Sequence, residues 1–172
     1  TARTDGWDDD ALIGSLFLTA VWDQLGIRKP DGSSATVLAF PWNLADTPHV
    51  DGLAYAMATH EDPWRPDIRS QVLKRVLDLA GDMRFVKLDG PRSGMLTLED
   101  EAARLVVFHG RDGWTDKVAG ASWKVSVPPW ASTAELWGWE GLRETVSVEG
   151  KPLVTFDVPG RETYMLRFKQ AE

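Results

Sequence analysis

The sequence contains no cysteine among its 172 residues. Disulfide bonds, zinc sites built on thiolates and thiol catalysis are therefore excluded. The absence leaves the compartment open, because a chain without cysteine can work on either side of a membrane.

Basic side chains are also scarce. Nineteen Lys and Arg residues stand against 26 Asp and Glu, which gives a net charge of −7 and a pI near 5.0. Nucleic-acid binding needs a basic surface, so this composition argues against a nucleic-acid partner. A neutral or cationic partner is easier to reconcile with the charge. No cofactor is expected, and the sequence holds no glycine-rich phosphate loop. Its serines do not form a G-x-S-x-G nucleophile elbow.

No hydrophobic run is long enough to cross a bilayer. The most apolar stretch, Ala11 to Trp22, is too short and predicts a buried helix, so we expect no membrane partner. Asp8, Asp9 and Asp10 suit the start of that helix, and Gly26 suits its end. Thr1 to Asp10 is polar and acidic, unlike a secretory leader.

A strand, a long loop and a second helix are predicted next. Ala35 to Phe40 is almost continuously apolar, which is typical of a strand buried on both faces in a parallel sheet. Leu44 to Pro66 is polar and long for a loop, and Gly52 to Met57 within it suits a short strand or a turn. The second helix opens at Pro66 and closes at Gly81. Its expected apolar face contains Ile68, Val72, Leu73, Val76 and Leu77.

After Gly81 the hydrophobic period becomes two, which predicts an antiparallel β-sandwich. The expected strands are Met83–Leu88, Gly94–Leu98, Arg104–His109, Ser122–Val127, Ala134–Trp139, Thr145–Val148, Leu153–Val158 and Thr163–Lys169. Glu149-Gly150 is expected to close a hairpin between the sixth and seventh of these strands. We therefore expect an α+β fold with a first part over 1–81 and a sandwich domain over 82–172, the second helix docking directly on the sandwich.

Nine tryptophans are the outlying feature of the composition. A flat indole can pack in a core, or it can stack on the C–H face of a sugar ring. Trp137 and Trp139 alternate, so we expect them on one face of a strand, where core packing against the helical part is the favoured interpretation. The excess of tryptophans as a group favours a carbohydrate partner.

The first part is odd in isolation, because one parallel-type strand with two helices cannot complete a sheet. The order of its features resembles the C-terminal end of a retaining (β/α)₈-barrel glycoside hydrolase, of the β-xylosidase and cellulase relatives. The matching segments are Val37–Phe40 with Trp42, Asp46, Gly52-Leu53, Arg65-Pro66, the helix Val72–Gly81, and the sandwich segments Ala103–Phe108 and Val154–Phe168.

This resemblance implies that Asp10–Gly26 is the seventh helix of an incomplete (β/α)₈ barrel and Ala35–Phe40 its eighth strand. It implies that Trp42 stacks on sugar at the mouth of the barrel, with Asp46 and His49 in reach of sugar hydroxyls. The family's two catalytic glutamates come from earlier strands that this chain lacks, so no catalytic residue is assigned. The implied partners are a carbohydrate and the missing N-terminal portion of the barrel.

Other interpretations of these features stay open. Trp42 also suits a core residue that caps the sheet, and Asp46 and His49 suit a polar loop. His60-Glu61-Asp62 is interpreted as a solvated turn, so no metal site is expected. His109 is expected to be a satisfied histidine on an edge strand. The alternative functions are a non-catalytic carbohydrate-binding or adhesion module, and a structural subunit whose lone strand completes a partner's sheet.

Overall fold

The structure is a computed structural model that describes residues 14, 17–19, 21, 27, 29–33, 43–45, 56–58, 68–89, 95–110, 120–160 and 162–170. The elements in chain order are β1 (Asn43–Ala45), β2 (Ala56–Ala58), α2 (Ile68–Ala80), β3 (Arg84–Asp89), β4 (Met95–Glu99), β5 (Ala103–His109), β6 (Ala121–Ser126), β7 (Thr133–Trp137), β8 (Leu142–Ser147), β9 (Leu153–Val158) and β10 (Thr163–Lys169). The fold is α+β and mostly antiparallel sheet, as the sequence predicts.

Two antiparallel sheets form the second half of the chain. The larger has six strands in the order β3-β4-β5-β10-β7-β8, and the smaller pairs β6 with β9. All eight strands expected between Met83 and Lys169 are present. The largest shift is at β8, which begins at Leu142 rather than at the expected Thr145.

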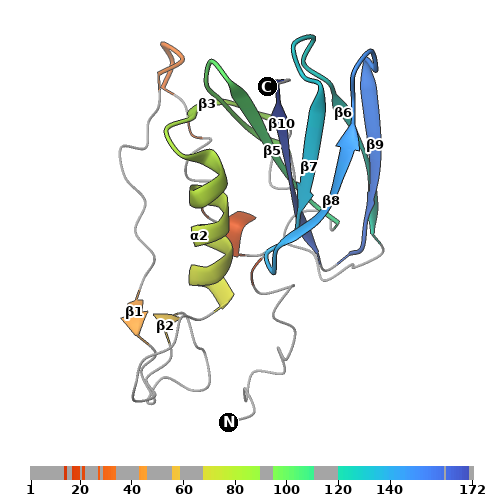
Figure 1. Ribbon diagram of the computed structural model, residues 1–172. Coiled ribbons are helices and arrows are strands. Elements are labelled where there is room, and N and C mark those ends of the chain that lie inside the picture. Colours follow the sequence, from red (N-terminus) through yellow and green to blue (C-terminus); the bar gives the residue numbers. More distant parts are fainter. Residues whose placement is uncertain are drawn as a thin grey trace.

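The six-stranded sheet lies between α2 on one face and the β6–β9 sheet on the other (Figure 1). The central strand β5 explains how one sheet serves two cores. Its alternate residues Leu105 and Val107 join the core under α2, while Val106 and Phe108 join the core under β6 and β9. Because side chains of a strand alternate between faces, this continuously apolar strand must be covered on both sides.

The helix α2 docks directly on the sheet, as the sequence predicts. Ile68, Val72, Val76 and Leu79 are each at most 5% exposed and pack against Leu105, Val107 and Met165 of the sheet. Burying a side chain of this size stabilises the fold by about 1.5–3 kcal/mol. The helix ends at Ala80, and Gly81 closes it as expected: its φ of 53° is left-handed and its N–H donates to the carbonyl of Leu77. Leu77 itself is 59% exposed, so its expected place on the buried face is wrong.

Part of the predicted first helix is also described. Gly14, Phe17, Leu18, Thr19 and Val21 are helical, and Leu18 is fully buried in the core under α2. A Cβ added at Gly14 would lie 2.8 Å from Cγ2 of Val72, so the two helices approach closely here. The expected strand Ala35–Phe40 lies outside the described residues.

The segment expected to be a long loop contains a parallel pair of short strands. β1 pairs with β2 in the register Asn43↔Ala56 and Ala45↔Ala58. The pairing corrects the expected loop over Leu44 to Pro66 and partly confirms the short strand expected within it. A parallel pair is the arrangement found in α/β units, where a crossover connects the two strands.

The prediction of a hairpin at Glu149-Gly150 is wrong. β8 pairs with β7, and β9 pairs with β6, so this turn carries the chain from one sheet to the other. Val148 is fully buried between the sheets, and the N–H of Lys151 donates to its carbonyl to close the turn. The N–H of Val127 donates to the carbonyl of Pro152, which joins the chain to the smaller sheet.

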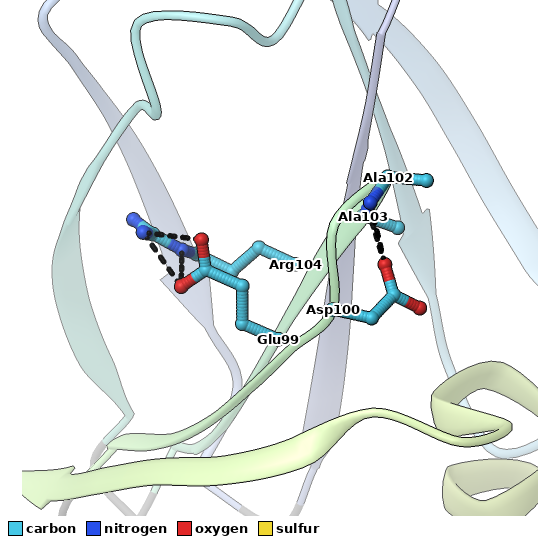
Figure 2. A network of polar contacts seen from close by, with 5 residues as sticks. All are labelled: Glu99, Asp100, Ala102, Ala103 and Arg104. Carbon is cyan, nitrogen blue, oxygen red and sulfur yellow. Dashed lines mark hydrogen bonds and ion pairs between the residues drawn. The ribbon is translucent and has the colours of Figure 1, made fainter.

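A polar network shapes the turn between β4 and β5 (Figure 2). One carboxylate oxygen of Asp100 accepts hydrogen bonds from the N–H groups of Ala102 and Ala103, at 2.8 and 2.7 Å. Beside it, Glu99 and Arg104 face each other across the strands and form a forked ion pair. The network satisfies backbone donors that the turn would otherwise leave to solvent.

Candidate functional site

The three site residues predicted from the sequence, Trp42, Asp46 and His49, lie outside the described residues. The described backbone nearest to them is β1, which begins directly after Trp42 and ends directly before Asp46 in sequence. Asp46 therefore follows the carboxyl end of a strand in a parallel pair. In α/β sheets and barrels, ligands bind at the carboxyl ends of such strands. The assignment of these residues stays a prediction.

Four of the nine tryptophans are described, and all four are partly buried against a core. Trp137 and Trp139 pack against the core under α2, and Trp123 and Trp130 pack against the core under the smaller sheet. The core interpretation of Trp137 and Trp139 is confirmed. Their placement on one strand is wrong, because β7 ends at Trp137 and Trp139 lies beyond it.

Trp139 lies at the tip of the hairpin that joins β7 and β8. Trp137 pairs with Leu142, and the N–H of Gly138 donates to the carbonyl of Gly141 at 2.9 Å. β7 ends at Trp137 and β8 begins at Leu142, so the loop has the four residues Gly138 to Gly141, with Trp139 and Glu140 at its tip. Sequence reasoning missed this loop, although two glycines flanking Trp-Glu in Gly138-Trp-Glu-Gly141 were a usable signal.

An open groove of about 530 Å³ lies where this loop meets the helix, and we call it the α2–hairpin groove. Its lining residues are Gln71, Lys74, Arg75 and Asp78 of α2 with Trp139 and Glu140 of the loop. Lys74 and Asp78 form an ion pair one helical turn apart. The guanidinium carbon of Arg75 lies 5.3 Å from the ring centre of Trp137, and its Nε donates to the carbonyl of Trp139 at 3.4 Å.

A second, larger cleft of about 670 Å³ opens between β8 and β9, which lie at the outer edges of their sheets. Arg143 lies in this cleft, with its guanidinium carbon 4.8 Å from the ring centre of Tyr164. It also donates to a carboxylate oxygen of Glu162 at 3.3 Å. Leu136, Val146 and Phe156 form an apolar wall that continues into the core under the smaller sheet.

A buried polar cluster surrounds His109, which is fully buried. Its Nδ1 lies 2.8 Å from Oγ1 of Thr163, and its Nε2 lies 3.3 Å from Oγ1 of Thr19. Its backbone carbonyl accepts a hydrogen bond from the indole of Trp123 at 2.6 Å. Both ring nitrogens of His109 have polar partners, as expected. The expected position at a sheet edge is wrong, because β5 lies inside the six-stranded sheet. The cluster is enclosed and polar contacts occupy both ring nitrogens, so it serves packing.

The described residues hold no group of three or more His, Asp or Glu side chains that could bind a metal ion. His60-Glu61-Asp62 and the aspartates at 8–10 lie outside those residues. Within the same ranges, no helix is long and apolar enough to span a membrane.

The pKa of Asp31 is lowered by hydrogen bonds, first from the hydroxyl of Ser33 and then from its N–H. This carboxylate caps an exposed turn.

No family model matches the chain, and no curated protein matches it. Solved structures of glycoside hydrolases do match. The chain is similar to the GH39 enzyme from Xanthomonas axonopodis pv. citri, with a TM-score of 0.57 and 12% identity over 99% of this chain and 43% of that enzyme. It also matches a GH30 endoxylanase from Clostridium papyrosolvens C71, with a TM-score of 0.48 and 12% identity over 59% of this chain and 27% of the other.

A Paenibacillus polymyxa xyloglucanase from GH family 44 matches over 60% of this chain and 23% of its own, with a TM-score of 0.42 and 11% identity. The chain spans less than half the length of each of these enzymes. At such low identity the likeness to the GH39 enzyme shows the fold alone, and that fold is like part of a glycoside hydrolase.

Proposed function

We propose that the chain is the C-terminal region of a retaining glycoside hydrolase that acts on a poly- or oligosaccharide. In this proposal residues 1–81 supply the last helix–strand–helix elements of a (β/α)₈ barrel, and residues 82–172 form its accessory β-sandwich. One observation supports it above the others. The similarity to the GH39 enzyme extends over 99% of the chain, so it includes the helical part as well as the sandwich.

The packing of α2 agrees with this division of the chain. A helix of an isolated helical part would bury its apolar stripe within that part, but α2 buries its stripe on the six-stranded sheet. The helix and the sandwich therefore depend on each other for their cores. Leu77 leaves an apolar side chain exposed on the opposite side of α2, where a neighbouring barrel helix would lie.

The roles proposed for this chain are binding and orientation of the sugar. Trp42 stacks on a sugar ring, while Asp46 and His49 hydrogen-bond to its hydroxyls. A retaining mechanism needs two carboxyl groups about 5–5.5 Å apart, one as nucleophile and one as acid and base. In this proposal both come from barrel strands encoded before Thr1. The present chain by itself is then expected to bind sugar without hydrolysing it.

A carbohydrate-binding module without catalytic partners has less support. It requires tryptophans exposed on the strands of the sandwich. The two described tryptophans that lie on strands, Trp123 and Trp137, both pack against a core.

The test is a measurement of kcat/KM for aryl β-glycosides with the longer polypeptide that includes the segment before Thr1. We expect hydrolysis, and we expect Trp42→Ala to lower kcat/KM by about tenfold, because one aromatic contact is worth ~0.5–1.5 kcal/mol beyond its buried area. Trp130→Phe, a conservative change in the sandwich core, serves as the control and is expected to leave kcat/KM unchanged. Equal values for the parent protein and a folded Trp42→Ala variant would contradict the role of Trp42.

A further inference from the structure

We propose that the α2–hairpin groove binds a neutral oligosaccharide, as a carbohydrate site separate from the Trp42 loop. The site goes beyond the proposed function, because Trp42, Asp46 and His49 do not line it. Its volume of about 530 Å³ falls within the ~300–1,000 Å³ typical of ligand pockets. Its walls come from two elements, α2 and the β7–β8 loop, that are far apart in sequence.

The aromatic side chain at the hairpin tip is the first argument. Tryptophan offers a large, flat apolar face. Trp139 packs against the core under α2 but is only half-buried, and it also lines the groove. Part of this side chain therefore stays accessible to a ligand from the groove.

The loop is held in place before any ligand arrives. Arg75 lies over the ring of Trp137 and donates a hydrogen bond to the carbonyl of Trp139, so it ties the loop to α2. A rigid site loses little conformational entropy when it binds, which favours affinity.

The lining chemistry indicates the ligand class. The indole of Trp139 offers an apolar face, on which the C–H groups of a sugar ring can pack. Lys74 and Asp78 pair with each other, but an ammonium has further donors and a carboxylate further lone pairs, so both can also bind a hydroxyl. Glu140 offers a carboxylate acceptor, and an amide such as that of Gln71 can both donate and accept. Two cations and two carboxylates leave no net charge, so a neutral glycan fits better than a charged one.

The experiment titrates the ¹⁵N-labelled 172-residue chain with xylotetraose, cellotetraose and mannotetraose, and follows the indole and side-chain amide signals by NMR. We expect at least one glycan to give saturable shifts at the Trp139 indole N–H and the Gln71 amide. Because Trp139 also packs against a core, the exposed residues Glu140 and Asp78 provide the test. Glu140→Ala and Asp78→Ala are each expected to weaken binding by about tenfold.

Glu149→Ala, at an exposed turn outside the groove, is the matched control and is expected to bind like the parent chain. The proposal is overturned if none of the three glycans shifts the Trp139 indole, or if neither groove variant weakens binding. Saturable shifts confined to residues outside the groove would overturn it as well. Trp42→Ala separates the two proposals, since it is expected to lower hydrolysis by the longer polypeptide without changing binding in the groove.

Discussion

Oγ1 of Thr19 lies 3.3 Å from Nε2 of His109, so a helical residue of the first part meets a central strand of the sheet through a buried polar contact. On the other side of the ring, Oγ1 of Thr163 lies 2.8 Å from Nδ1. Both threonines are almost fully buried. The helical part and the sandwich are thus joined by polar contacts as well as by the apolar core under α2.

Thr163→Val should therefore destabilise the fold. Valine keeps the shape and the β-branch of threonine but removes the hydroxyl that contacts His109. Loss of a buried polar partner costs about 1–3 kcal/mol, and urea unfolding followed by circular dichroism would measure it. Thr155→Val, on an exposed position of β9, is the control and should change stability by no more than about 0.5 kcal/mol. Equal effects of the two changes would show that the contact contributes nothing.

Gly110→Ala should destabilise the fold by more than the addition of one methyl group suggests. A Cβ at residue 110 would lie 1.8 Å from the carbonyl oxygen of Pro159 and 2.7 Å from that of Val158, and both are backbone atoms. The chain must move to accept the methyl group, which we expect to cost at least about 2 kcal/mol. Gly141→Ala meets nothing within 4 Å and should be nearly neutral by the same thermal or urea unfolding measurement. A neutral Gly110→Ala would contradict the close approach.

Asp100→Ala should weaken the turn between β4 and β5, because it removes the acceptor of two backbone hydrogen bonds. By analogy with helix caps we expect a loss of about 1 kcal/mol in the free energy of unfolding. Asp100→Asn keeps a side-chain oxygen in the same position and should retain most of the stability. If the Asn and Ala variants unfold at the same urea concentration, the hydrogen bonds to Ala102 and Ala103 are not what stabilises the turn.

Acid should weaken the turn at Asp31. Hydrogen bonds from the hydroxyl and the N–H of Ser33 hold the pKa of Asp31 below its ordinary value. Because this pKa is lowered in the folded turn, the charged carboxylate stabilises the turn at any pH above the ordinary pKa of an aspartate. The stabilisation is lost as the pH falls through the lowered pKa, where the carboxyl group becomes protonated. Ser33→Ala removes the larger cause and should raise the pKa, whereas Ser33→Thr keeps the hydroxyl. Carbon-detected NMR titration of the Asp31 carboxyl group gives the midpoint for each variant. Identical midpoints for Ser33→Ala and the parent protein would show that the Ser33 hydroxyl does not lower this pKa.

The strands of the second half were predictable because side-chain alternation is a local property. β9 and β10 occupy the expected residues, and the other strands differ only at their ends. The pairing of strands was not predictable, because the Glu149-Gly150 turn has the same sequence signature whether the next strand returns to its own sheet or crosses to another. Burial of Val148 between the sheets decides this, and it depends on residues distant in sequence.

The predicted apolar face of α2 was drawn too wide. Helical periodicity placed Val72 and Val76 correctly, and Leu79 continues their i, i+4, i+7 spacing and is buried. Leu77 directly follows Val76, so it lies off this stripe and is exposed. Likewise, alternation joined Trp139 to the strand of Trp137, although the chain turns between them. The α2–hairpin groove could not be predicted from either segment alone, because it exists only where the two meet.

The proposed glycoside hydrolase is tested most directly by sequencing the segment encoded before Thr1 and assaying the polypeptide that joins it to this chain. We expect the upstream segment to contain barrel strands with two glutamates at their carboxyl ends. The joined polypeptide should hydrolyse aryl β-glycosides with retention of anomeric configuration, and residues 1–172 alone should give no turnover. A coding sequence that begins at Thr1, or an upstream segment without strand-end glutamates, would refute the proposed function.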